Sequence, residues 1–175
     1  LDWISPVDGT QSSLIWDDLL PLNEIPLIIN PESGWLISTN QDPFKVTSQD
    51  SNLSPKNYSS TLGLQTRMTN RANRGLELFS ATEFISEQDF KKIKFDNAYS
   101  YNSRAYEYLR QIFDIDFQDK QLIEGKKILI DWNLKTDFNN RSAALGVCVI
   151  SPEWLAEQEQ KTPPSPLKVF QGCVK

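Results

Sequence analysis

The chain changes character near residue 60, and this change limits its possible folds more than any other feature. Before residue 60, turn-forming Pro, Gly, Ser and Asn residues separate short extended segments, of which 27–30 and 35–39 are the clearest. Beyond it, apolar residues recur at helical spacing, as they do between Ala105 and Phe113. The sequence therefore predicts an α+β fold, with short β-strands in its N-terminal part and a mainly helical region after them.

The same patterns divide the chain into three parts. Residues 1–60 are predicted to form a β-rich segment, residues 61–160 a helical subdomain, and residues 161–175 a Pro-rich linker with the start of a further strand. Near both ends of the chain the residue pattern is that of structured chain, with apolar residues among polar and turn residues. We therefore expect a piece cut from a longer protein. A processed mature chain is the alternative.

Local signals predict several helix starts. Ser86, with Asp89 three residues later, has the pattern of a capping box. Asn140 is predicted to begin a short apolar helix over 142–150, and the Ser-Pro pair at 151–152 to begin another.

Composition excludes two classes of partner. The chain has 18 basic and 23 acidic side chains, for a formal net charge of −5. Nucleic-acid binding needs clustered positive charge, so we expect no nucleic-acid partner. The longest apolar runs, 25–29 and 143–150, are far shorter than the roughly 20 residues that span a bilayer, so we expect no transmembrane segment and no membrane partner.

The chain contains no histidine and two cysteines, Cys148 and Cys173. Without His it cannot form a Ser–His or Cys–His pair by itself, so its chemistry needs another base or residues from elsewhere. Two cysteines fit neither a disulfide scaffold nor a zinc site. Cys148 lies in the apolar stretch 145–150 and is predicted to be a buried small hydrophobe.

Two features of the first 60 residues are candidates for a functional site. Asn40 follows the second predicted strand, and Pro43 stiffens the turn after it, so its side-chain amide is placed to donate to a developing oxyanion. Taken alone, a turn role for Asn40 is the simpler interpretation. Trp3, Trp16 and Trp35 fit a hydrophobic substrate pocket, but core packing is the commoner use of such residues.

The motif Asn30-Pro31-Glu32-Ser33-Gly34-Trp35, followed by Asn40-x-x-Pro43, resembles the β-chain signature of the penicillin acylase (penicillin amidase) family. The resemblance is closest to the branch of acyl-homoserine lactone and aculeacin acylases. Looser similarity extends upstream to residue 2 and downstream through 67–74 and 95–100, so it covers nearly the whole chain. It implies an internal β-chain piece of an enzyme with the αββα fold of the N-terminal nucleophile hydrolases.

The resemblance implies a mechanism that needs no histidine. In that family a precursor cuts itself into two chains and exposes a Ser at the start of the β-chain. The Ser hydroxyl attacks an amide carbonyl while its own α-amine acts as the base. Residue 1 here is Leu, so we expect the nucleophile to lie outside this chain and the chain alone to be inactive.

The resemblance also implies site residues. Asn40 occupies the position of the oxyanion-hole donor. Of the three tryptophans considered above for a substrate pocket, Trp35 is the candidate substrate-binding residue. Arg67 is the candidate for a family Arg that orients the catalytic groups, with Arg71 as runner-up because a gap leaves the register open. No cofactor is required, but some members hold a structural calcium ion, for which the candidate ligand is Asp50 or the serine after it.

Two functions are consistent with these observations. The first is part of an acylase that hydrolyses the amide bond of a small N-acyl substrate, in antibiotic metabolism or quorum quenching, in the periplasm or outside the cell. Its partners would be the α-chain and the rest of the β-chain of the same autoproteolytic precursor. The alternative is a non-catalytic helical binding or interaction domain.

Overall fold

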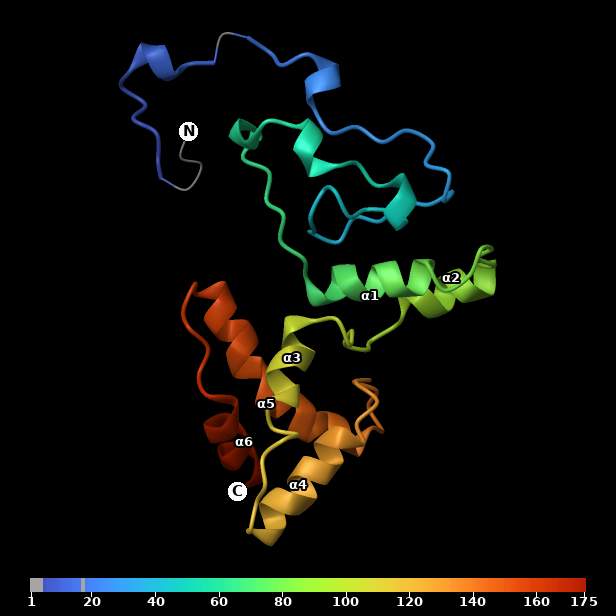
Figure 1. Cartoon of the computed structure of the whole chain (residues 1–175), viewed down its shortest axis with the longest axis vertical. Helices are drawn as coiled ribbons and strands as arrows, with labels where there is room; N and C mark the ends of the chain where they lie inside the picture. Colours follow the sequence, from blue (N-terminus) through green and yellow to red (C-terminus); the bar gives the residue numbers. More distant parts are fainter. Residues whose placement is uncertain (1–4, 17) are drawn as a thin grey trace. The chain divides into compact units, whose positions relative to one another are not determined.

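The computed structural model describes residues 5–16 and 18–175, and the chain divides into two compact units. The N-terminal unit is Leu1–Met68 and the C-terminal unit is Thr69–Lys175. In Figure 1 the N-terminal unit runs from blue to green and the C-terminal unit from green to red. Trp3, a candidate pocket residue, lies outside the described residues.

The N-terminal unit is built from turns and irregular chain. Its regular elements are five short 3₁₀ helices: η1 (Ser12–Leu14), η2 (Leu22–Glu24), η3 (Gln49–Ser51), η4 (Pro55–Asn57) and η5 (Ser60–Leu62), counted over its described residues. The strands predicted between residues 20 and 45 are not found there, so the α+β prediction is wrong. The described chain is 46% helical and 1% strand, with no sheet.

The physical reason is that this backbone finds its hydrogen-bond partners locally. Ser, Thr, Asn and Asp side chains compete for the N–H and C=O groups that a strand partner would otherwise take. Between residues 20 and 60, one described backbone bond joins residues more than three apart, from Ile37 N to Val46 O at 2.8 Å.

The C-terminal unit contains six α-helices within its fully described range, Thr69–Lys175. They are α1 (Asn70–Phe79), α2 (Glu87–Lys94), α3 (Arg104–Arg110), α4 (Lys120–Ile130), α5 (Arg141–Gln158) and α6 (Pro166–Val174). The first five lie where the periodicity of the sequence predicts helices. The sixth replaces the strand predicted after the Pro-rich linker, because Pro166 occupies the first helical position, where its missing N–H costs nothing.

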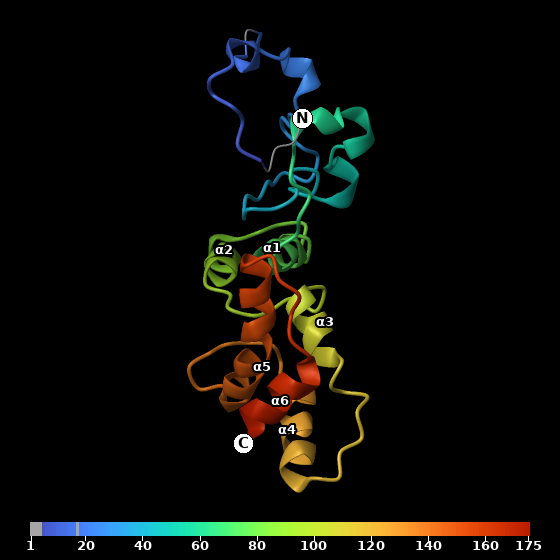
Figure 2. The ribbon, with the colours of Figure 1, turned by 90° about the vertical axis from the view of Figure 1, so that its left-hand side faces the viewer.

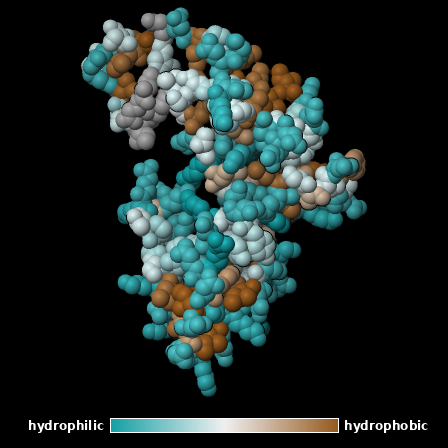
Figure 3. All heavy atoms as spheres, in the orientation of Figure 1, coloured by the Kyte–Doolittle hydropathy of each residue, from teal (hydrophilic) through white to brown (hydrophobic). Residues whose placement is uncertain are grey.

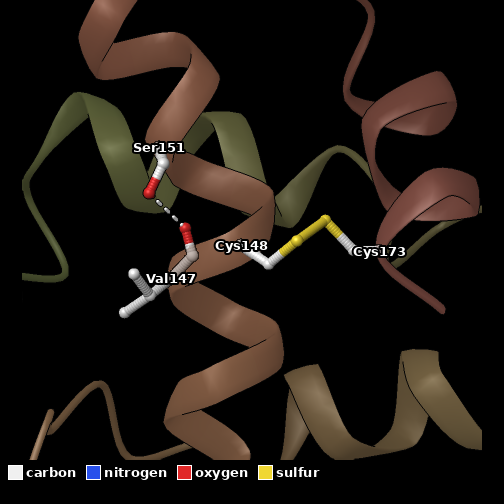
Figure 4. The surroundings of a disulfide bond; sticks show 4 residues. All are labelled: Val147, Cys148, Ser151 and Cys173. Carbon is white, nitrogen blue, oxygen red and sulfur yellow. Dashed lines mark hydrogen bonds between the residues drawn. A yellow bond between two sulfur atoms is a disulfide. The ribbon is translucent and has the colours of Figure 1, made fainter.

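The helix starts confirm one local prediction and correct another. Ser86 caps α2 by accepting a hydrogen bond from Asp89 N at 3.2 Å, as the capping box predicts. The two helices predicted to meet at residues 151–152 are instead one helix, α5, with Pro152 inside it. Ser151 is not a cap: its hydroxyl donates to Val147 O at 2.6 Å, one turn earlier in the same helix (Figure 4).

Helices α3, α4, α5 and α6 enclose the hydrophobic core of the C-terminal unit, and Figures 1 and 2 both show α6 beside α4 and α5. The buried residues of this core are Tyr108, Leu109, Ile112, Leu129, Trp132, Leu134, Ala143, Val149, Ile150 and Phe170. Two helical glycines allow the close packing. A Cβ at Gly146 would lie 2.3 Å from the Trp132 ring, and one at Gly125 would lie 2.8 Å from Val174.

The two cysteines form a disulfide that the sequence analysis did not predict. Cys148 of α5 is bonded to Cys173 of α6, with their Cα atoms 6.1 Å apart (Figure 4). Cys148 is exposed, so the prediction of a buried hydrophobe is wrong. The apolar residues around it, Leu145, Val147, Val149 and Ile150, are buried in the core or packed against it, whereas Cys148 is exposed and bonded to α6.

The N-terminal unit exposes many large apolar side chains and buries few. Figure 3 shows hydrophobic atoms at the surface of this unit. The exposed large apolar residues before residue 69 are Val7, Leu14, Ile15, Trp16, Leu19, Leu20, Leu22, Ile25, Leu27, Ile29, Leu36 and Leu64. Of the helices in the described chain, none has the length and apolar character needed to cross a membrane.

Candidate functional site

The candidate site is the loop of residues 30–52, which carries Trp35, Asn40 and Asp50. Asn40 has a left-handed backbone with φ +57°, and its side chain is exposed. Asn tolerates this conformation better than most residues, since its short polar side chain bonds locally. Asn30, at the start of the motif, has a similar φ of +49°. Both Asn positions are therefore set in part by backbone conformation.

Hydrogen bonds fix the backbone on both sides of Asn40. Thr39 donates from its backbone N–H to Gln41 Oε1 at 2.9 Å and also from its hydroxyl. Gln41 Nε2 in turn donates to Lys45 O at 2.6 Å. The carboxylate of Asp42, which is buried, accepts from Phe44 N at 2.9 Å. The side-chain amide of Asn40 is thus presented by a turn that is internally bonded.

Trp35 is held through its backbone carbonyl. The Thr47 hydroxyl donates to Trp35 O at 2.8 Å, and the Ser33 hydroxyl contacts both Thr47 Oγ1 and the same carbonyl. The amide of Asn52 closes the loop, because its Oδ1 accepts from Val46 N at 3.0 Å and its Nδ2 donates to Thr47 O at 3.1 Å. The Trp35 side chain is half-buried.

Three residues that organise this loop were missed by the sequence analysis: Asp42, Thr47 and Asn52. The first carries a recognisable signal, since Asp followed by Pro favours a turn whose backbone N–H bonds back to the carboxylate. Thr47 and Asn52 lie in a polar stretch that is typical of loop. Nothing in their local pattern distinguishes them from other polar loop residues.

The structure places the candidate arginines differently from one another. Arg67 is exposed and lies in the irregular stretch between η5 and α1, whereas Arg71 is exposed in the first turn of α1. A third arginine, Arg74, pairs with two carboxylates of the C-terminal unit. Its guanidinium donates to both carboxylate oxygens of Asp96, at 2.8 and 2.9 Å, and to Glu77 at 3.2 Å.

This arginine fixes the loop of residues 96–102 on α1. Arg74 holds the pKa of Asp96 below its usual range, mainly through the hydrogen bonds between them, and the pKa of Arg74 is raised in turn. Glu77 accepts from the Ser100 hydroxyl at 2.5 Å and from Asn102 at 3.0 Å. Arg74 is therefore a structural residue in the C-terminal unit.

Asp50 is the candidate ligand for a structural calcium ion. Calcium takes six to eight oxygen ligands, commonly from several carboxylates. Asp50 is exposed in η3, and nowhere in residues 5–16 and 18–175 do three or more His, Cys, Asp or Glu side chains gather as metal ligands do.

Residues 2–162 of the chain match the penicillin amidase family. Because this match covers most of the sequence, the chain belongs to that family. It is part of an acylase-type amidohydrolase, in agreement with the first of the two functions considered from the sequence. The family match includes the whole loop of residues 30–52.

Proposed function

We propose that this chain supplies the oxyanion-hole donor, Asn40, of an acylase that cleaves N-acyl amide bonds. The nucleophile would be an N-terminal Ser contributed by another part of the same precursor. The observation that carries the proposal is the conformation of Asn40: an exposed amide on a turn that is bonded on both sides, within a chain of the penicillin amidase family.

In the proposed reaction the Ser oxygen attacks the amide carbon, and the α-amine of that Ser takes the hydroxyl proton. The carbonyl oxygen then gains negative charge, and the N–H of Asn40 Nδ2 donates a hydrogen bond to it. Collapse of this intermediate expels the amine, and water later hydrolyses the acyl-enzyme. A donor placed before the reaction lowers the barrier because it does not have to reorganise as charge develops.

Arg67 and Trp35 complete the proposed site. The guanidinium of Arg67 would orient the catalytic groups through hydrogen bonds, with Arg71 as the alternative. The Trp35 side chain would contact the apolar part of the substrate, and the fixed carbonyl of Trp35 supports this role by limiting the movement of the residue. The acyl-homoserine lactone and aculeacin acylase branch remains the proposed subfamily.

The surface of the N-terminal unit supports the proposed partner. Its described part exposes twelve large apolar side chains, and other parts of the precursor would cover them. The Cys148–Cys173 disulfide supports the proposed periplasmic or secreted location, since disulfides persist in oxidising compartments.

The test is Asn40→Gly in the processed enzyme, with Asn30→Gly as the matched control. Glycine keeps the left-handed conformation at both positions, so only the side-chain amide is lost. We expect Asn40→Gly to lower kcat by about 10²–10³-fold with little change in KM, and Asn30→Gly to leave kcat near wild type.

Processing must first be verified by the masses of the two chains, because an uncut precursor is also inactive. Fully processed Asn40→Gly enzyme with wild-type kcat would remove Asn40 from the oxyanion hole. Substrates for the assay are a penicillin, an N-acyl homoserine lactone and a simple N-acyl amino acid, and their kcat/KM ratios identify the branch.

A further inference from the structure

Helix α6 is short and depends on the rest of the C-terminal unit for its structure. It has nine residues, and isolated helices of that length are unstable in water. Its one fully buried side chain is Phe170, whose ring lies 5.5 Å from that of Phe117. The Pro-rich linker before α6 is held by a hydrogen bond from the Tyr108 hydroxyl to Pro164 O at 2.8 Å. The packing of Phe170 and Val174 against the core, this hydrogen bond and the disulfide keep α6 in place.

The disulfide between α5 and α6 is accessible from solvent. Cys148 is exposed and Cys173 is half-buried, and Figure 4 shows the bond crossing from the side of α5 to α6. Exposed disulfides are the ones that external thiols attack, whereas disulfides in a core are protected. We therefore expect a reductant to reach the bond from the side of Cys148.

Helix α5 has anchors that do not depend on the disulfide. Val149 and Ile150 are buried in the core, and the guanidinium of Arg104 donates to Glu153 at 3.0 Å. Pro152 provides no N–H to the Cys148 carbonyl, but the helix continues through it to Gln158. Opening of the disulfide is thus expected to release α6 and to leave α5 in position.

We propose that the Cys148–Cys173 disulfide is a redox lock that holds α6 on the helical core and that a dithiol reductant opens it. One thiolate of the reductant attacks Cys148 Sγ, the S–S bond breaks, and Cys173 leaves as a thiolate that takes a proton. The second thiol of the reductant then displaces Cys148 as a thiol. Two electrons and two protons pass to the cysteines, and the reductant becomes a cyclic disulfide.

The size of the effect follows from the chain that the bond closes. The two cysteines are 25 residues apart, so the cross-link removes much of the entropy that α6 and its linker gain on release. By the entropy of loop closure, reduction shifts the equilibrium between docked and released α6 by about 10²-fold towards release. Release exposes Phe170 and Val174 and the space over Gly125 that they fill.

The test is amide hydrogen exchange of the full chain with and without reduced dithiothreitol. Mass spectrometry confirms reduction by the gain of two hydrogens. We expect exchange in α6 to accelerate by about 10²-fold on reduction, and exchange in α2, which lies outside the helical core, to stay unchanged. The double variant Cys148→Ser, Cys173→Ser should exchange in α6 like the reduced wild type and should not respond to dithiothreitol.

Two results would overturn the proposal. In the first, the disulfide resists dithiothreitol under native conditions, so it is not accessible. In the second, the bond is reduced but α6 exchanges as before, so Phe170 and the linker hold α6 without it. Reduction of the wild type tests the proposal even if the double variant does not fold.

Discussion

The two units of this chain obtain their structure in different ways. The C-terminal unit buries ten apolar residues in one core between four helices, whereas only Ile37 and Phe44 are buried apolar residues among the described part of the N-terminal unit. The N-terminal unit relies on hydrogen bonds from polar side chains to its own backbone. Hydrogen bonds in exposed loops contribute less to net stability than apolar burial does.

Charge follows the same division. The sequence has three basic and eight acidic residues before residue 69, and fifteen of each from there to the end, so the whole net charge of −5 belongs to the N-terminal unit. The difference in buried apolar core, rather than the difference in charge, indicates that the C-terminal unit is stable by itself. The N-terminal unit, which carries the candidate site, has a shaped loop but little core, and we expect it to need further contacts for stability.

The largest effect is expected from Gly146→Ala in the core of the C-terminal unit. The new Cβ would overlap the Trp132 ring, whose Nε1 is fixed by a hydrogen bond to Lys135 O at 2.9 Å. We expect a loss of about 3 kcal/mol in unfolding free energy, measured by urea denaturation. Gly172→Ala in α6 is the control, because its Cβ meets open space and should stabilise the helix by up to about 1 kcal/mol. Equal effects of the two changes would contradict the described packing.

A smaller effect is expected from Asp96→Asn, which breaks the bidentate pair with Arg74. At pH 7 we expect a loss of about 2 kcal/mol in unfolding free energy. The pKa of Asp96 is lowered in the folded state, so its contribution is full above its unfolded pKa of about 3.9 and is lost as the pH falls through the folded value. The difference between variant and wild type should therefore narrow below about pH 4 in a series of denaturation curves. A difference that stays constant down to pH 2 would show that Asp96 acts by packing.

Thr47→Val tests the hydrogen-bonded loop of the N-terminal unit. The change keeps the shape of the side chain and removes the hydroxyl that donates to Trp35 O. We expect a local loss of about 1 kcal/mol, seen as faster hydrogen exchange at the Ile37 amide, with no change in the unfolding of the C-terminal unit. Thr10→Val is the control, since that hydroxyl bonds only to neighbouring Asp8. Destabilisation of the helices by Thr47→Val would show that the units are not independent.

The smallest effect is expected from Ser86→Ala, which removes the N-cap of α2. The Ser86 hydroxyl accepts from Asp89 N, and its loss typically costs about 1 kcal/mol. Because α2 lies outside the core of α3 to α6, we expect faster hydrogen exchange within α2 and little change in the exchange of α5. Equal acceleration in both helices would place α2 in the same cooperative unit as the core.

The sequence predicted the helices well because helical periodicity and capping residues act over a few residues. Ser86 and Asp89 are an example, since they lie within one turn of each other. The strands were predicted wrongly because alternation over five residues does not provide a partner strand, and here local side chains took the hydrogen bonds. The disulfide was missed because Cys148 and Cys173 meet only through the packing of α5 against α6.

The candidate site was located in part from its motif. Asn40 and Trp35 belong to a short block with turn residues at fixed positions, and the structure places them in one bonded loop. The residues that hold this loop, such as Thr47 and Asn52, act over five to fourteen residues of separation, and no local pattern marks them. No contact of the described residues tests the proposed roles of Arg67 and Asp50, so these roles stay predictions.

The central claim, that the C-terminal unit is stable by itself and the N-terminal unit is not, is tested most directly by cutting the chain between Met68 and Thr69. Circular dichroism and thermal unfolding of the two pieces are the measurement. We expect residues 69–175 to keep their helical signal and a cooperative transition within a few degrees of the whole chain, and residues 1–68 to show no cooperative transition. A cooperative transition in residues 1–68, or its absence in residues 69–175, would contradict the account.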